Sequence, residues 1–208
     1  MSWTQAGFTL FGQHLLYTDL VGNICALATV VLAMKRTIWT WPVQLVGSVL
    51  LFVASVEAHI TGNALKQAMF GLLAVYGWVK WVRGMRDGET LPVRPGRTRE
   101  RVVLVAVMVA ATALVALFFS VTGWSWAPLP DAYIFVGSAI ATYAQGRALI
   151  DFWWIWIAVD LVGVPLAFSS GLVVSGVVYG IFFVMVLLGI REWRRQYSRR
   201  LELEVVTI

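Results

Sequence analysis

Seven stretches of the chain are apolar enough and long enough to cross a lipid bilayer as helices. The hydrocarbon core of a bilayer needs about 20 consecutive apolar residues per helix, with roughly 17 to 25 tolerated. Apolar residues make up 60% of the chain and charged residues only 13%, which excludes ordinary water-soluble classes of protein. We therefore predict an all-α membrane protein, one transmembrane domain over residues 1–208, with spans at 18–34, 40–58, 63–82, 102–122, 132–147, 152–168 and 171–190.

The segment before the first span does not have the features of a cleavable signal peptide. Met1–Tyr17 has no basic start and no small-residue cleavage site, and Gln and His residues interrupt it. Its apolar residues predict a short helix in the membrane interface instead. These residues are Trp3, Phe8, Leu10, Phe11, Leu15 and Leu16.

The basic residues flank the apolar stretches and predict one orientation. Of the 16 Lys and Arg residues, all except Lys66 fall at the ends of the first, third, fifth and seventh spans or in the segments that follow them. Cytoplasmic segments carry the excess of Lys and Arg in membrane proteins, so we expect the N-terminus outside and the C-terminus in the cytoplasm. This placement also argues against nucleic acid as the partner, because the positive charge reports topology.

A charged stretch at 83–101 combines Gly and Pro with both signs of charge and predicts a cytoplasmic linker. It separates a three-helix group at 18–82 from a linking helix at 102–122. A second three-helix group at 132–190 and a cytoplasmic tail at 191–208 follow. Because the linking helix crosses back, both groups run in the same sense, which predicts a 3+1+3 arrangement of parallel repeats.

Short sequence matches support this repeat weakly. Gln44–Gly47 and Asp160–Gly163 share Leu-Val-Gly after a polar residue in the second and sixth spans, and we take their places as equivalent. Gly77–Trp81 and Gly189–Trp193 share a Gly-x-x-x-Trp pattern where the third and seventh spans end. Asp19–Gly22 repeats the first pattern at a place that is not equivalent, so such matches also arise by chance.

Asp160 is the clearest ionisable residue inside a predicted span. It stands about 12 Å along the helix from Phe152 at 1.5 Å per residue, close to the middle of the bilayer. Such a group costs about 2.5 to 3.5 kcal/mol there and usually faces a cavity or a partner. Trp153, Trp156 and Asp160 are spaced i, i+3 and i+7, which predicts flat rings below a hydrogen-bond acceptor on one helix face.

The alternative interpretation of this stripe is structural. A neighbouring hydroxyl or amide would hold a buried Asp160, and the Trp side chains would lie at the cytoplasmic interface of the membrane. Phe152 and Trp154 lie off the shared face, and we expect both in the aromatic belt at that interface.

In the first three-helix group the candidate binding residues are polar or aromatic side chains, each of which could equally join helices to one another. They are Asn23, Gln44, Gln67, Tyr76 and Trp78.

Near the outer end of the second span, Glu57 and His59 are expected at a solvated entrance, with proton coupling as an alternative. Pro42 and Pro165 are expected to mark bends.

Several kinds of site have no sequence motif here. We find no phosphate-binding loop, no His/Cys metal cluster and no nucleophile motif, so we predict no catalytic residue, metal or cofactor. The lone Cys25 excludes an intramolecular disulfide. No Arg occupies the interior of a predicted span, so a phosphate group would meet Asp160 without a compensating cation. A ligand at this place should therefore be unphosphorylated.

Three motifs together resemble those of the PnuC family of vitamin transporters, in which the residue matching Asp160 is Asn. The resemblance extends over about residues 18–193. The motifs are Trp153-x-x-Trp156-x-x-x-Asp160 in the sixth span, Leu65-x-Gln67 followed by Tyr76-Gly77-Trp78-x-x-Trp81 in the third, and Trp39-x-Trp41-Pro42 at the start of the second.

The resemblance implies a seven-helix fold similar to that of the SWEET sugar transporters, in the plasma (cytoplasmic) membrane. It also implies facilitated diffusion of an unphosphorylated vitamin without ion coupling, a cytoplasmic kinase that traps the product, and a homotrimer in contact with membrane lipid. The binding residues implied are Trp153, Trp156, Gln67 and Asp160.

The vitamin itself depends on the branch of the family. Pro130–Gly137 and Val159–Leu166 look most like the riboflavin-carrying branch, PnuX/RibM, which makes riboflavin the leading hypothesis. A carboxylate would also suit cationic nicotinamide riboside or thiamine, so both stay open. From a different class, a membrane-embedded enzyme or a scaffold is the alternative.

Overall fold

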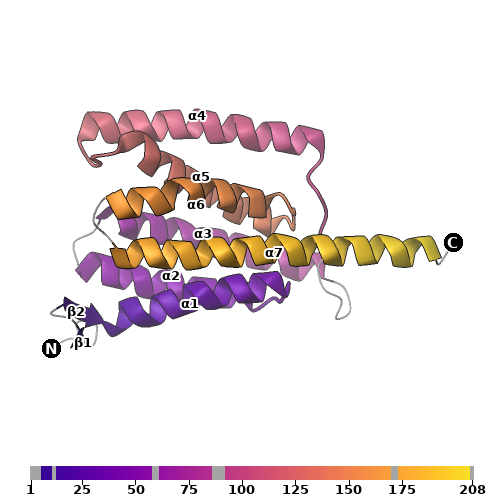
Figure 1. Cartoon of the computed structure of the whole chain (residues 1–208), viewed down its shortest axis with the longest axis horizontal. Coiled ribbons are helices and arrows are strands. Elements are labelled where there is room, and N and C mark those ends of the chain that lie inside the picture. Colours follow the sequence, from indigo (N-terminus) through magenta and orange to yellow (C-terminus); the bar gives the residue numbers. More distant parts are fainter. Residues whose placement is uncertain (1–5, 11–12, 58–60, 86–91, 170–172, 207–208) are drawn as a thin grey trace. The chain divides into compact units, whose positions relative to one another are not determined.

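The structure is a computed structural model that describes residues 6–10, 13–57, 61–85, 92–169 and 173–206. This part of the chain forms a two-stranded hairpin and seven helices (Figure 1). It divides into two compact units, Met1–Thr90 and Leu91–Ile208. In chain order the elements are β1 (Gly7–Leu10), β2 (Gln13–Leu16), α1 (Tyr17–Met34), α2 (Thr40–Glu57), α3 (Thr61–Gly84), α4 (Thr98–Thr122), α5 (Pro128–Gly146), α6 (Phe152–Ser169) and α7 (Val173–Val206).

Each predicted span coincides with one helix. The starts differ most for α4 and α5, which begin at Thr98 and Pro128 rather than at residues 102 and 132. Proline is tolerated in a first helical turn because the N–H that it lacks has no partner there anyway. Among the described residues, α1, α2, α4 and α6 are each long and apolar enough to cross a membrane. The all-α membrane architecture is confirmed, with seven helices in the described part of the chain.

The segment before α1 is a hairpin, so the predicted interfacial helix is wrong for the residues that are described. β1 and β2 pair antiparallel, with Gly7 opposite Leu16 and Leu10 opposite Gln13. Gly and Thr residues in this segment disfavour a helix, and Thr favours extended backbone. Trp3 and Phe11 lie outside the described residues.

The seventh helix continues past the predicted end of its membrane span. α7 continues from Val173 to Val206, a length of 34 residues. At 1.5 Å per residue it extends about 50 Å, well beyond the roughly 30 Å of a bilayer core. Arg, Glu and Leu are good helix formers, so the charged segment after residue 190 has no reason to end the helix. The expected tail is therefore a direct continuation of the last span.

In the first unit, α2 and α3 meet through a tryptophan ring that lies against a glycine. Trp41 is fully buried, and its ring stands edge-on to Trp81 with centroids 5.3 Å apart and planes at 87°. A Cβ atom at Gly77 would lie 2.3 Å from the Trp41 ring. The two helices can therefore approach this closely only because residue 77 has no side chain.

In the second unit, α6 and α7 meet in the same way. Trp153 is 1% exposed and stands edge-on to Trp193, with centroids 5.8 Å apart and planes at 86°. A Cβ atom at Gly189 would lie 2.3 Å from the Trp153 ring. These three residues lie 112 positions after Trp41, Gly77 and Trp81, as their numbers show.

Small residues also set the contacts of α1 with α2 and of α5 with α6. A Cβ atom at Gly22 would lie 2.6 Å from the side chain of Leu51, and one at Gly137 would lie 2.4 Å from that of Val159. Each close contact pairs a glycine on one helix with a branched side chain on its neighbour. Side-chain volume is thus matched across both helix pairs.

The connections before α2 and α6 also share a backbone shape. Arg36 and Ala148 both have positive φ values, 55° and 54°, just after α1 and α5 end. Their N–H groups donate to Ala33 O at 3.0 Å and to Gln145 O at 2.9 Å. Glycine is the usual residue at such a position, and other residues there carry a small steric cost.

The predicted match between Gln44–Gly47 and Asp160–Gly163 is wrong in register. α2 and α6 both contain 18 residues, but Gln44 is the fifth residue of α2 and Asp160 the ninth of α6. The shared letters therefore lie at different depths in the two helices. The Gly-x-x-x-Trp patterns, by contrast, make the same contacts in each unit.

Replacing the contact glycines should destabilise the fold. We expect Gly77→Ala and Gly189→Ala each to lower the free energy of unfolding by about 1 to 3 kcal/mol, because the buried Trp rings have no free space to move into. Gly180→Ala is the control, since no heavy atom lies within 4 Å of a Cβ atom there. Thermal unfolding in detergent measures the difference, and equal melting temperatures for Gly180→Ala and Gly189→Ala would contradict the packing argument.

Candidate functional site

Asp160 lies in the middle of α6 and is buried inside the second unit. Its side chain is 2% exposed, and Oδ2 has no hydrogen-bond partner among the described residues. Gly163, one turn further on the same face, lies against Tyr179 of α7 and Ile134 of α5. A buried carboxylate oxygen without a donor is costly, by about 1 to 3 kcal/mol in proteins. A role for this oxygen as the acceptor for a ligand stays a prediction.

The two predicted ring partners of Asp160 are placed differently. Trp153 is held in the contact of α6 with α7, and its Nε1 has no hydrogen-bond partner among the described residues. Trp156 is half-buried, one turn closer to Asp160. The helix brings all three side chains onto one face, as the spacing predicts. Stacking of a ligand ring on either tryptophan stays a prediction.

Phe152 and Trp154 behave differently from each other. Trp154 is half-exposed, and the guanidinium of Arg194 lies 5.3 Å from its ring centroid, as a belt residue with a neighbouring cation would. The prediction that Phe152 is also a belt residue is wrong. Its ring is buried, with its centroid 4.2 Å from that of Trp153 and 4.9 Å from that of Trp193, because the first turn of α6 packs against Trp193 of α7.

The candidate residues of the first unit lie on three helices. Gln67 of α3 is buried, Gln44 of α2 and Tyr76 of α3 are half-buried, and Trp78 is exposed. The amide of Asn23 donates to the backbone oxygen and to the carboxylate of Asp19, at 2.9 and 3.1 Å. Asn23 therefore bonds within its own helix.

At the end of α2, Glu57 is half-buried, whereas His59 lies outside the described residues, so proton coupling stays a prediction. Among the described residues no three His, Cys, Asp or Glu side chains come close enough together to hold a metal ion. Asn63 of α3 donates to the hydroxyl of Ser55 in α2 at 2.7 Å, a polar contact between helices that the sequence pattern did not predict.

Sequence reasoning also missed the polar contacts of the linker. Residues Arg94 to Arg101 were interpreted only as a charged connection, yet several of them bind Arg147 and Asp151 in the connection of α5 with α6. The one available signal was the spacing of Arg97 and Glu100, three residues apart at a helix start. No sequence pattern indicates the contacts with the distant residues Arg147 and Asp151.

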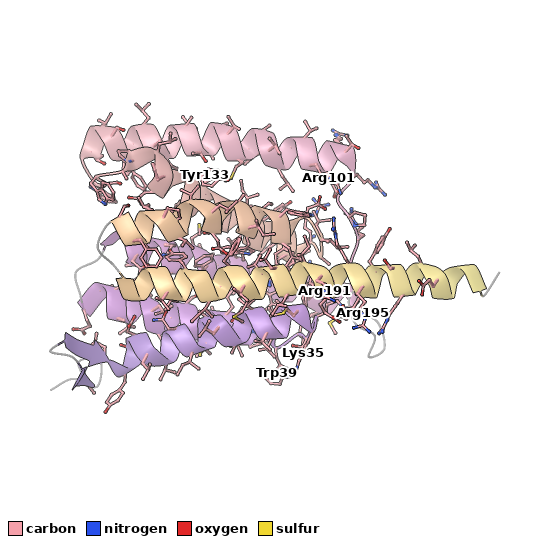
Figure 2. The ribbon with its side chains drawn as sticks, in the orientation of Figure 1. Lys35, Trp39, Arg101, Tyr133, Arg191 and Arg195 are labelled. Carbon is pink, nitrogen blue, oxygen red and sulfur yellow. The ribbon has the colours of Figure 1, made fainter. Side chains whose placement is uncertain are left out.

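Cations gather at one end of the helices in the second unit. Arg101 near the start of α4 and Arg191 and Arg195 of α7 lie toward the same end, and Tyr133 in the first turns of α5 lies toward the other (Figure 2). In the first unit, Lys35 and Trp39 lie at the connection of α1 with α2 (Figure 2). Within each unit the arrangement agrees with the alternation of charge along the sequence.

A family model described as Nicotinamide mononucleotide transporter matches residues 16–195. The chain belongs to this family. It is 46% identical over 198 residues to the Riboflavin/roseoflavin transporter RibM of Streptomyces davaonensis, covering 93% of this chain and 92% of that protein. It is 23% identical over 207 residues to the Nicotinamide riboside transporter PnuC of Escherichia coli, covering 88% and 87%.

Among solved structures, the crystal structure of the Vitamin B3 transporter PnuC matches with a TM-score of 0.70 at 20% identity, covering 88% of this chain and 83% of that chain. The resemblance to the PnuC family that the motifs predicted is confirmed. The protein is a multi-pass membrane transporter and not an enzyme, because the family that it belongs to and the relative at 46% identity are transporters.

Replacing Asp160 should stabilise the protein if the carboxylate serves a ligand and not the fold. We expect Asp160→Leu to raise the free energy of unfolding by about 1 to 3 kcal/mol, because it removes a buried acceptor without a donor. Asp131→Leu is the control, since Asp131 accepts a hydrogen bond from Ser125 and stands in the first turn of α5, so its loss should destabilise. Thermal unfolding without ligand measures both. A loss of stability in Asp160→Leu as large as that in Asp131→Leu would assign Asp160 to the fold.

Proposed function

We propose that the protein takes up riboflavin by facilitated diffusion, with alternating access and without ion coupling. The observation that carries this proposal is the 46% identity, over 93% of the chain, to a riboflavin/roseoflavin transporter. At such identity the residues that contact a ligand are usually the same in both proteins. The buried acceptor on α6 supplies the chemical reason for a ligand of this kind.

Riboflavin offers groups that match the candidate site. Its flat three-ring system can stack on Trp156 and meet the edge of Trp153, and its imide N–H and ribityl hydroxyls can donate to Asp160. On the first three-helix group, the side chains proposed to complete the site are Asn23, Gln44, Gln67, Tyr76 and Trp78.

The vitamin is proposed to cross unphosphorylated. α5 and α6 contain no Lys or Arg, so a phosphate beside Asp160 would place two negative groups together without a cation. A cytoplasmic vitamin kinase is then the enzyme that traps the product.

A second substrate is favoured by a specific observation. The family model and the Escherichia coli relative are both named for nicotinamide compounds. Nicotinamide riboside and thiamine carry a positive charge that a carboxylate at residue 160 would attract. We therefore keep nicotinamide riboside, and after it thiamine, as the alternative substrates of the same site.

We also propose the 3+1+3 arrangement of parallel repeats, similar to that of SWEET transporters. The repeats span 18–82 and 132–190, the linker 83–101 and the linking helix 102–122. The support is that the Trp–Gly–Trp contacts and the positive φ values recur at a constant spacing of 112 positions, as the residue numbers show. The orientation proposed has the N-terminus outside and the tail 191–208 in the cytoplasm, in line with the charge distribution.

A homotrimer embedded in membrane lipid is proposed as the assembly. α4 supports a role in lipid or subunit contact, because most of its Val and Leu side chains are exposed in the isolated chain. Cross-linking in native membranes measures the number of copies.

Counterflow is the experiment that tests transport. Proteoliposomes loaded with unlabelled riboflavin should accumulate labelled riboflavin above equilibrium without an ion gradient, and flavin mononucleotide outside should not compete. Vesicles loaded with nicotinamide riboside or thiamine test the alternatives in the same way. If the folded protein shows no counterflow with any of the three vitamins, the proposal that it transports such vitamins is wrong.

The charge at residue 160 should set ligand affinity. We expect Asp160→Asn to weaken riboflavin binding about tenfold, because a hydrogen bond to a charged acceptor is replaced by one to a neutral amide. Quenching of flavin fluorescence on binding to the purified protein measures the affinity. If Asp160→Asn binds riboflavin with unchanged affinity, Asp160 is not part of the binding site.

Trp153 and Trp41 form a matched pair for testing the ring stripe. Both are buried against a glycine in the same way, so Trp153→Phe and Trp41→Phe should lower stability to a similar extent. We expect only Trp153→Phe to weaken riboflavin binding, by about 3- to 10-fold, since it alone lies on the face of Asp160. Equal loss of affinity in both variants would show that Trp153 acts only through packing.

A further inference from the structure

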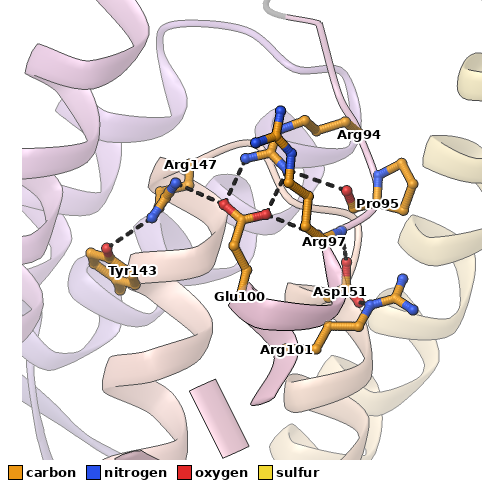
Figure 3. Close-up of polar contacts among 9 residues, drawn as sticks. Arg94, Pro95, Arg97, Glu100, Arg101, Tyr143, Arg147 and Asp151 are labelled. Atoms are coloured by element: carbon orange, nitrogen blue, oxygen red, sulfur yellow. Dashed lines mark hydrogen bonds and ion pairs between the residues drawn. The ribbon is translucent and has the colours of Figure 1, made fainter. Parts of the chain in front are cut away.

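The linker that precedes α4 is joined to the start of α6 by a network of charged groups, here called the linker clamp. Its members are Arg94, Gly96, Glu100, Arg101, Arg147 and Asp151. Figure 3 labels the five that contribute side chains. All six lie in the second unit.

Glu100, in the first turn of α4, joins three segments. Its carboxylate receives two hydrogen bonds from Arg94 of the linker, at 2.7 and 2.8 Å, and one from the backbone N–H of Arg97 at 2.9 Å. It also receives a hydrogen bond from Arg147, just after α5, at 2.8 Å. The two hydrogen bonds that Arg94 donates to Glu100 are the main reason why the pKa of the Arg94 guanidinium is raised.

Asp151 makes the second half of the clamp. It directly precedes α6, where an Asp commonly bonds to the N–H groups of its own helix. Its carboxylate instead accepts the N–H of Gly96 at 2.5 Å and pairs with Arg101 Nε at 2.6 Å. Backbone hydrogen bonds run beside it, from Arg94 N to Ala148 O at 3.2 Å and from Ile150 N to Arg94 O at 2.9 Å.

The matching turn in the first unit, before α2, forms without a carboxylate. The connection from α1 to α2 has the same positive φ, at Arg36, and the residue at the place of Asp151 is Trp39, which is 63% exposed. The same backbone turn forms there without an acid. The carboxylate of Asp151 therefore has its partners in the linker and α4.

We propose that Asp151 and Glu100 are positioning residues for transport, which fix α4 and the start of α6 as one body while the substrate site opens to either side. This inference rests on the proposed function, because α6 carries Trp153, Trp156 and Asp160. α4 is then a moving part of the second three-helix group and does not act as a passive tether. Without the clamp, α6 can shift against α4. Movement of α4 is then only partly transmitted to the substrate site on α6.

Substitutions of the clamp should slow transport more than they weaken binding. We expect Asp151→Asn and Glu100→Gln to lower the initial rate of riboflavin uptake by about fivefold, as for a network of half-exposed charge-assisted hydrogen bonds. Their affinity for riboflavin should stay within about twofold of that of the parent. Arg99→Gln is the control, since Arg99 is exposed in the same helical turn and lies outside the clamp. Uptake by Asp151→Asn at the rate of the parent would overturn the proposal.

A reversible covalent clamp gives the sharper test. A Cβ atom at Gly96 would lie 3.4 Å from Cγ of Asp151, close enough for a disulfide between Gly96→Cys and Asp151→Cys in a Cys25→Ala background. The reduced pair lacks the carboxylate and should transport slowly, and oxidation should restore the rate of the Cys25→Ala parent. An oxidised pair slower than the reduced pair would show that α4 must move against α6, which overturns the proposal.

A distance measurement tests the clamp even if the vitamin assignment fails. Nitroxide labels at Leu117 of α4 and Leu161 of α6, both well exposed, should give one narrow distance in the Cys25→Ala parent. The distribution should broaden when Asp151→Asn and Glu100→Gln are combined. Equal widths would overturn the clamp, whereas absent riboflavin counterflow in the parent would overturn only the proposed function.

Discussion

Close approach of a tryptophan ring to a helical glycine is the contact on which the arrangement of both units depends. Trp41 lies against Gly77, and Trp153 lies against Gly189, each with a second tryptophan edge-on to the ring. In a membrane the apolar tails of lipid compete with apolar side chains, so packing and not the hydrophobic effect must hold helices together. A large flat ring on bare backbone provides such packing. The contact of Trp153 with Gly189 also fixes the start of α6 against α7, and with it the position of Asp160 along the helix.

The helices could be predicted from sequence because the bilayer imposes a minimum length on every apolar stretch. All seven predicted spans coincide with helices, and the errors lie at the ends. α7 continues past residue 190 because nothing in its charged part ends a helix. The N-terminal segment was interpreted as a helix because its composition is apolar, but composition alone does not separate a hairpin from an interfacial helix.

The candidate site was predictable only in part. The cost of a charge in the bilayer identified Asp160, and the structure places it buried with Oδ2 unpaired among the described residues. Local spacing did not reveal that Phe152 and Trp153 pack under Trp193, since that contact joins residues far apart in the chain. The linker clamp escaped notice for the same reason. In the sequence Glu100 stands between two Arg residues and Asp151 between two apolar residues, so only the folded structure shows their distant partners.

The glycines at the contacts of α1 with α2 and of α5 with α6 have a consequence for the history of the chain. At one level the glycine is on α2, facing Cys25, and at the matching level of the second unit it is on α5, facing Val159. At another level Gly22 of α1 faces Leu51, whereas Ile134 of α5 faces Gly163. The glycine and the larger residue that it contacts have thus exchanged helices between the two units. If both units descend from one duplicated ancestor, each exchange required a compensating pair of mutations, so a single helix of one unit could not now replace its counterpart in the other.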